Sequence, residues 1–281
     1  MLVRLSCVAV IAGSLAAATV DAGMPYQKTM TCPIGGEKFK HTFTASYSTF
    51  GNRPDGKPYG SWTFPIPIPV CPSNKLPIYS EFSKEELASL GPLVASTEFK
   101  QIAVANTPYY NAAWLMQQMG EKPETVAWMI VKASWEADGN AAQKRRYQED
   151  YVARIMALPK NDKLIDWLFY QIRAVNGLRE LGRFDEAVSL ADKLAPDAQT
   201  ALANAKSKGN DPNNPESEID SAEYLVTFLA KMKGVAASRN PSSEPIALLP
   251  TREARYFCKE KAASLTPQDK ADCANLSDRD D

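Results

Sequence analysis

Histidine is almost absent from this 281-residue sequence, in which His41 is the only one. A catalytic triad built on histidine would therefore have to use that residue. The sequence also lacks a Gly-x-Ser-x-Gly turn, a glycine-rich phosphate loop and a His-Glu-x-x-His motif. These absences exclude the commonest hydrolase, nucleotide-binding and zinc-protease patterns, so we expect no enzyme, no catalytic residue and no cofactor.

An excess of charge of either sign is missing as well. The chain has 32 Lys and Arg against 33 Asp and Glu, which gives a formal charge of −1. Nucleic acid and anionic membranes are recognised by strongly basic surfaces, so neither is expected as a partner. After the N-terminal segment, no stretch has the roughly 20 apolar residues of a membrane span, and the mature chain is expected to be soluble.

An N-terminal signal peptide is predicted for residues 1–22. A positively charged residue precedes an apolar run, and Val20 and Ala22 place small residues where a signal peptidase reads them. Gly23 would then begin the mature chain, with cleavage after Ala18 or a retained anchor as alternatives. The pattern predicts a protein of the periplasm or a secreted protein.

Cysteine is sparse, and its distribution fits export. Removal of Cys7 with the signal peptide leaves an even number: Cys32, Cys71, Cys258 and Cys273. In an oxidising compartment such a set suggests disulfides, and three pairings are possible. We favour Cys32–Cys71 and Cys258–Cys273, because each of these pairs brackets one self-contained segment.

A small β module is predicted for residues 23–80. Apolar and polar residues alternate over Lys38–Ser48, which is typical of a half-buried strand. Pro54-Asp55-Gly56 is a turn signal. The apolar stretch Trp62–Val70 contains three prolines, so it should lie at an edge or run as a polyproline-like chain.

A helical domain is predicted for residues 81–235. Its first helix starts at the capping box Ser83-x-x-Glu86 and is expected to end at Gly91-Pro92. Caps and periodicity predict the further helices Pro108–Gly120, Pro123–Gly139, Ala141–Leu158, Leu164–Leu181 and Asp185–Leu194, and one that contains Ile219 to Met232.

The C-terminal part is predicted to be a linker and a small hairpin. Residues 236–250 are rich in Ser and Pro and are taken as the linker. Two short helices follow within residues 251–281, and Cys258 and Cys273 lie one on each. Closing a loop of about 15 residues by a disulfide would stabilise this hairpin by roughly 3 kcal/mol in the chain-entropy model.

The clearest motif is the run Leu178–Ala187, in which a helix ends at Gly182, an aromatic follows at Phe184, and Glu186-Ala187 opens the next helix. It resembles the turn of a tetratricopeptide repeat. The resemblance implies antiparallel helix pairs, and an ordinary helical hairpin is the alternative. The fold class expected is mainly α with a small β module.

Cys32-Pro and Cys71-Pro each resemble half of a zinc knuckle. A family of uncharacterised bacterial proteins joins such a cysteine ribbon to tetratricopeptide-like helices, and this chain is similar in its order of parts. Gly35 and Asn74 stand where the second cysteine of each knuckle would be. Structural zinc needs four ligands, and His41 could supply only a third. We therefore expect a disulfide here and no metal.

The aromatic residues of the helical region favour a binding function. They are Tyr109, Tyr110, Trp114, Trp128, Trp135, Trp167 and Tyr170. Most should pack between helices, and a minority could line the groove with which helical stacks hold peptides. The sequence thus predicts a non-enzymatic binding or scaffolding protein of the cell envelope with a protein or peptide partner. It leaves open the partner's identity, the partner-binding residues and the oligomeric state.

Two other functions remain as alternatives. The carboxylate pairs Glu136/Asp138 and Glu149/Asp150 could serve an envelope hydrolase. A metal-binding protein is the other alternative, with ligands from the Cys32/Cys71 module.

Overall fold

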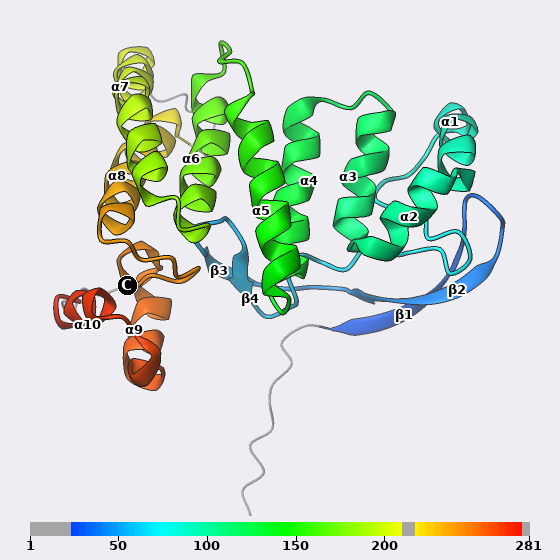
Figure 1. Cartoon of the computed structure of the whole chain (residues 1–281), viewed down its shortest axis with the longest axis horizontal. Helices are drawn as coiled ribbons and strands as arrows, with labels where there is room; N and C mark the ends of the chain where they lie inside the picture. The colour runs from blue at the N-terminus through cyan, green and yellow to red at the C-terminus, as the bar shows by residue number, and fades with distance from the viewer. Residues whose placement is uncertain (1–23, 210–216, 277–281) are drawn as a thin grey trace, which may run out of the picture.

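A row of helices and a small β module along one edge of it make up the molecule (Figure 1). The computed structural model describes residues 24–209 and 217–276, so the predicted signal peptide lies outside the described residues. The chain is mainly helical with a small β part, as predicted. Within the described ranges, no helix has both the length and the apolar character needed to cross a membrane.

Two antiparallel hairpins form the β module: β1 (Pro25–Thr31) with β2 (Lys38–Thr44), and β3 (Thr49–Asn52) with β4 (Pro58–Gly60). The strand predicted to reach Ser48 ends at Thr44. The reason is local, because the Thr44 hydroxyl donates a hydrogen bond to the Ser46 carbonyl (2.6 Å) and the chain leaves the sheet. The predicted turn at residues 54–56 joins β3 to β4.

The proline-rich segment 62–70 is irregular, apart from an isolated bridge between Val70 and Pro77. Its backbone carbonyls bind side chains instead of a neighbouring strand. The Tyr109 hydroxyl donates to the Ile66 carbonyl (2.7 Å), and Nε2 of His41 lies 3.2 Å from the Pro67 carbonyl. The segment is thereby held against both the helices and β2.

The first helices are α1 (Lys84–Ala95), α2 (Thr97–Ala105) and α3 (Pro108–Gln118). The predicted capping box is present, because Ser83 accepts from the Glu86 N–H and the Glu86 carboxylate accepts from the Ser83 N–H. The predicted end at Gly91-Pro92 is wrong. Proline at 92 removes one backbone donor, but α1 continues to Ala95, where the apolar side chains of Leu90 and Val94 are buried.

The central helices are α4 (Pro123–Glu136), α5 (Ala141–Met156) and α6 (Leu164–Glu180). Their starts agree with the predicted ones, and their ends lie within three residues of them. Gly120 and Gly182 follow α3 and α6 with positive φ, the conformation that lets a helix end at glycine.

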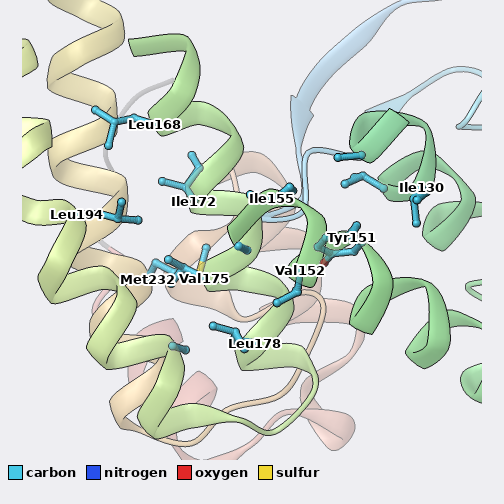
Figure 2. Close-up of a cluster of buried hydrophobic side chains, with 14 of the residues drawn as sticks. Ile130, Tyr151, Val152, Ile155, Leu168, Ile172, Val175, Leu178, Leu194 and Met232 are labelled. Atoms are coloured by element: carbon cyan, nitrogen blue, oxygen red, sulfur yellow. The ribbon is translucent and has the colours of Figure 1, made fainter. Parts of the chain in front are cut away.

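The core fills the space between α4, α5, α6, α7 and α8 (Figure 2). Ile155, Ile172 and Leu178 are at most 1% exposed. Gly177 allows α5 and α6 to approach closely, because a Cβ at this position would lie 2.5 Å from Val152 Cγ2 and 2.6 Å from the Tyr151 hydroxyl.

The last helices of the row, α7 (Phe184–Lys208) and α8 (Glu218–Ala237), are longer than the others. The helix predicted to end at Leu194 continues through Pro196. The small apolar residues that α7 packs inward recur at helical spacing on both sides of the proline: Ala187, Ala191, Leu194, Ala198, Ala201 and Ala205. Burial of this continuous stripe outweighs the loss of one backbone hydrogen bond.

The C-terminal part comprises a 3₁₀ turn, η1 (Ile246–Leu248), the helix α9 (Thr251–Glu260), a second turn, η2 (Ala262–Ser264), and α10 (Pro267–Ala274). The segment expected as a linker begins inside α8, and its Asn240 and Ile246 are buried. The Asn240 amide and the Ile246 N–H both donate to the buried Asp269 carboxylate, which also caps α10. The hairpin is thus tied to the segment that precedes it.

A buried ionic cluster anchors the β3–β4 hairpin to the helices. Arg53 pairs with Asp55 and with Asp138, whose carboxylate also binds Lys57 (2.7 Å) and Lys144 (2.8 Å). Burial alone would raise the pKa of Asp138, but the three surrounding cations hold it well below its usual value.

A second polar cluster continues from the first into α6. Lys144 lies 3.5 Å from Glu180, which also accepts from Gln148 (2.7 Å) and Asn176 (2.8 Å). Burial raises the pKa of this carboxyl. The neighbouring Arg179 is fully buried and donates to the carbonyls of residues 240 and 242. The polar contacts therefore reach from the β module to the C-terminal segment.

Gly177→Ala should lower the free energy of unfolding by about 1–3 kcal/mol, because the new methyl group overpacks the α5–α6 contact. Gly234→Ala in α8 is the matched control, since a Cβ there meets nothing within 4 Å. It should stabilise the protein by about 0.5 kcal/mol. Urea unfolding of both variants measures the difference, and equal stabilities would contradict the close approach.

Asp138→Asn should destabilise the protein at neutral pH by about 1.5–3 kcal/mol, because Arg53 and two lysines lose a charged acceptor. A carboxyl with a depressed pKa contributes fully above its unfolded pKa of about 3.9 and loses this contribution as the pH falls. The difference in the free energy of unfolding between wild type and variant should therefore stay constant from pH 8 to about pH 5 and become smaller below about pH 4. Asp192→Asn removes an exposed pair with Lys233 and should cost less than about 1 kcal/mol. A difference for Asp138→Asn that is independent of pH would contradict the ionic role.

Candidate functional site

The candidate site is a pocket between α4 and α6, here called the α4/α6 pocket. These two helices flank α5 (Figure 1). The pocket has a volume of about 570 Å³ and opens to solvent. Its lining comes from α4, from α6 and from the α5–α6 loop: Glu124, Trp128, Leu158, Pro159, Asn161, Lys163, Asp166, Trp167, Phe169, Tyr170 and Arg173. A volume of this size holds a small ligand or a few residues of a chain.

Aromatic side chains form much of the wall. Trp128 comes from α4, whereas Trp167, Phe169 and Tyr170 come from α6, and all of them are half-buried. The indole N–H of Trp167 donates to the Leu158 carbonyl (3.2 Å), which fixes the α5–α6 loop against the pocket. Aromatic faces held in this way offer stacking surfaces to apolar groups, sugars and peptide side chains.

The charged residues that line the pocket are Glu124, Lys163, Asp166 and Arg173. Burial raises the pKa of Tyr170, and the nearby carboxylates of Glu124 and Asp166 raise it further. Both carboxylates belong to the N-terminal turns of their helices. The cation Arg173 lies two turns further along α6, and Lys132 lies two turns beyond Glu124 on α4. Lys132 Nζ is 5.8 Å from the centre of the Trp128 ring.

The two Cys-Pro sequences form turns with the same hydrogen bonds. In the first turn, the Cys32 N–H donates to the Glu37 carbonyl and the Cys32 carbonyl accepts from the Gly36 N–H. In the second turn, the Cys71 N–H donates to the Leu76 carbonyl and the Cys71 carbonyl accepts from the Lys75 N–H. A disulfide joins the two turns, with a Cα–Cα distance of 5.6 Å. A Cβ added at Gly35 would lie 3.8 Å from the Asn74 amide nitrogen, so the two positions compared with missing knuckle cysteines face each other.

Potential metal ligands in this module involve Glu37 rather than His41. Among the described residues, one oxygen of Glu37 and the sulfurs of Cys32 and Cys71 lie within 4.8 Å of one another. The Ser73 hydroxyl and N–H donate to Glu37 and lower the pKa of its carboxyl. In the disulfide, neither sulfur is the thiolate that binds zinc. His41 contacts the Pro67 carbonyl and the Phe43 ring instead.

The carboxylates considered for hydrolysis do not line the α4/α6 pocket. Glu136 accepts from the Tyr109 N–H (2.9 Å), and burial raises the pKa of its carboxyl. Asp138 is the centre of the ionic cluster described above. Glu149 and Asp150 form ion pairs within α5, 3.1 Å from Arg145 and 2.7 Å from Arg154.

The aromatic residues noted in the sequence divide into two groups. Trp128, Trp167 and Tyr170 line the α4/α6 pocket. The remaining four pack inside the protein: Tyr109, Tyr110, Trp114 and Trp135. Sequence reasoning missed the charged residues of the pocket. The spacing of seven residues from Asp166 to Arg173 along α6 was the signal that could have shown these two on one face.

Comparisons of this chain with protein families, with curated proteins and with solved structures found no match.

Replacing Cys32 and Cys71 together by alanine should lower the free energy of unfolding by about 4 kcal/mol, because the bond closes a segment of 39 residues. The matched pair is Cys258→Ala with Cys273→Ala, whose separation is 15 residues. It should cost about 3 kcal/mol or less and mainly increase amide exchange in α9 and α10. Equal losses of unfolding free energy, with amide exchange increased throughout the protein by both double variants, would contradict these separate roles of the two disulfides.

Proposed function

We propose that this chain is an exported, non-enzymatic binding protein that holds a segment of a peptide or protein partner in the α4/α6 pocket. The observation that carries the proposal is the set of half-buried aromatic residues around an open pocket of about 570 Å³. These side chains leave part of their surface uncovered beside the pocket. Partly covered aromatics of this kind are frequent anchors at binding surfaces.

The arrangement of the helices supports a peptide rather than a compact small molecule. The helices pack one after another, as in repeat proteins whose stacked pairs hold peptides in an extended groove. The tetratricopeptide-like turn at residues 178–187 joins α6 to α7, so α6 would be the first helix of such a repeat. In this interpretation α6 presents its aromatic residues to a bound chain.

Two features support export. Disulfides such as Cys32–Cys71 and Cys258–Cys273 persist in oxidising, extracellular environments. The N-terminal signal pattern then favours the periplasm or the secreted fraction as the location.

Hydrolysis in the same pocket is the less favoured function. Glu124 and Asp166 both line the pocket, but Glu124 is only half-buried and Asp166 is exposed. A carboxyl that acts as a general acid near neutral pH is usually enclosed by apolar groups. Solvated carboxylates at a pocket entrance fit the recognition of a cationic group better.

Trp128→Ala should weaken peptide binding at least tenfold, because truncating a central aromatic anchor costs about 2 kcal/mol or more. The measurement is a screen of the wild-type protein against a random hexapeptide library, followed by titration calorimetry of selected peptides with each variant. Tyr256→Ala, on α9 and outside the pocket, is the control and should bind like wild type. The proposal fails if wild type binds no peptide at millimolar concentration, or if the two variants bind equally well.

A further inference from the structure

Arg173 forms no ion pair in the described part of the chain, although the nearby carboxylate of Asp55 counters the lowering of its guanidinium pKa by burial. Its Nε is buried without a hydrogen-bond partner, and none of its nitrogens forms an ion pair or hydrogen bond with any residue in the described ranges. Burial lowers the pKa of this guanidinium, yet arginine stays charged in proteins. Part of the residue remains exposed where it lines the α4/α6 pocket.

Three other cations that are buried or partly buried in the described chain have partners, whereas Lys132, described below, forms no ion pair. Arg53 binds two carboxylates, and Lys144 binds Asp138 and Glu180. Arg179 leaves only its Nε without a partner, because its other nitrogens bind an amide oxygen and two carbonyls. An unpaired charge at a pocket wall is costly unless a ligand pairs with it.

The surroundings of Arg173 hold it in place without pairing with it directly. The turn after β3 lies against its side chain, since a Cβ at Gly56 would come within 2.9 Å of its Nε. Asp55 in the same turn is the nearest candidate acceptor. Both of its oxygens are already engaged, by the Arg53 guanidinium and the Lys57 N–H.

A second cation, Lys132, lies beside Trp128 but is not among the residues that line the pocket. Lys132 lies over the rings of Tyr109 (5.7 Å) and Trp128 (5.8 Å) and pairs with no carboxylate of the described chain. Burial lowers the pKa of its ammonium group. Trp128 thus has a cation beside one part of its ring and the pocket beside another.

The carboxylates of Glu124 and Asp166, near which Lys163 also lines the pocket, are separated from Arg173 by the length of a short peptide. Short turns join α4 to α5 and α5 to α6, so α4 and α6 run in the same direction (Figure 1). Seven residues from Asp166 to Arg173 and eight from Glu124 to Lys132 correspond to about 10–12 Å along a helix. An extended chain covers this distance with about three or four residues.

We propose that the α4/α6 pocket binds a peptide by its free C-terminus, with the terminal carboxylate on Arg173 and a cationic group three or four residues away at Glu124 and Asp166. The cationic group is the peptide's own amino terminus or a basic side chain. Apolar side chains between the two ends stack on Trp128, Trp167 and Tyr170. This inference rests on the proposed peptide-binding function and adds the terminus, the orientation and the length of the ligand.

The test compares a library of tripeptides and tetrapeptides with free ends and the same library amidated at the C-terminus. Wild-type protein should bind the free acids at least tenfold more tightly than the amides. N-acetylation of peptides without a basic residue should weaken binding several-fold, since Glu124 and Asp166 lose their partner. Raising the salt concentration should weaken binding of the free acids more than that of the amides.

Arg173→Gln should abolish the preference for free acids, so that acid and amide bind with a ratio near one, and Arg173→Lys should restore part of it. Arg239→Gln, which removes an exposed arginine outside the pocket, is the control and should keep the full preference. If Arg173→Gln does not fold, the comparison of acids with amides on wild type still decides.

The possible outcomes separate the inference from the proposed function. Equal binding of acids and amides by wild type overturns the C-terminal inference but leaves a peptide-binding protein. Binding of inorganic phosphate at Arg173, without displacement by any free-acid peptide, overturns it in favour of a site for small anions. Failure of both libraries and of the hexapeptides overturns the proposed function itself.

Discussion

Buried polar contacts that pass through α6 join the separate parts of this chain. Asp138 binds the β3–β4 hairpin, Glu180 receives Lys144 from α5, and Arg179 holds the segment that leads to the C-terminal hairpin. Such groups tolerate burial only when their partners are in place. The apolar core alone would allow several arrangements of these parts, whereas the polar contacts require one. The position of Arg173 depends on them too, because the turn that packs against it is anchored by Arg53.

Much of the fold followed from local signals in the sequence. Gly120 and Gly182 ended helices as predicted, because a left-handed residue closes a helix without help from distant contacts. The two cysteine pairings favoured from segment boundaries are those in the structure. The errors occurred where a local rule met a tertiary gain. The helices expected to end at Gly91-Pro92 and at Leu194 continue instead, and each buries apolar side chains on both sides of its proline.

The site was harder to predict for a geometric reason. Its aromatic residues were noted, but sequence cannot say which of them lie between helices and which face a pocket, since both positions favour the same residue types. Its charges belong to helices separated by α5, so no local pattern brings Glu124 to Asp166. The missing partner of Arg173 is a property of the whole fold, because Asp55 would be available if Arg53 did not already bind it.

The disulfide between Cys32 and Cys71 has a mechanical consequence. It closes a covalent loop whose joined ends pack with Leu90, Phe99 and Leu115 of α1 to α3, while Arg53 fixes the middle of the loop to Asp138 in the turn between α4 and α5. The loop therefore connects two separate points along the row of helices. In such rows each helix pair contacts only its neighbours, so the row as a whole can bend. A loop of fixed length limits that bending between α1 to α3 and the turn that joins α4 to α5.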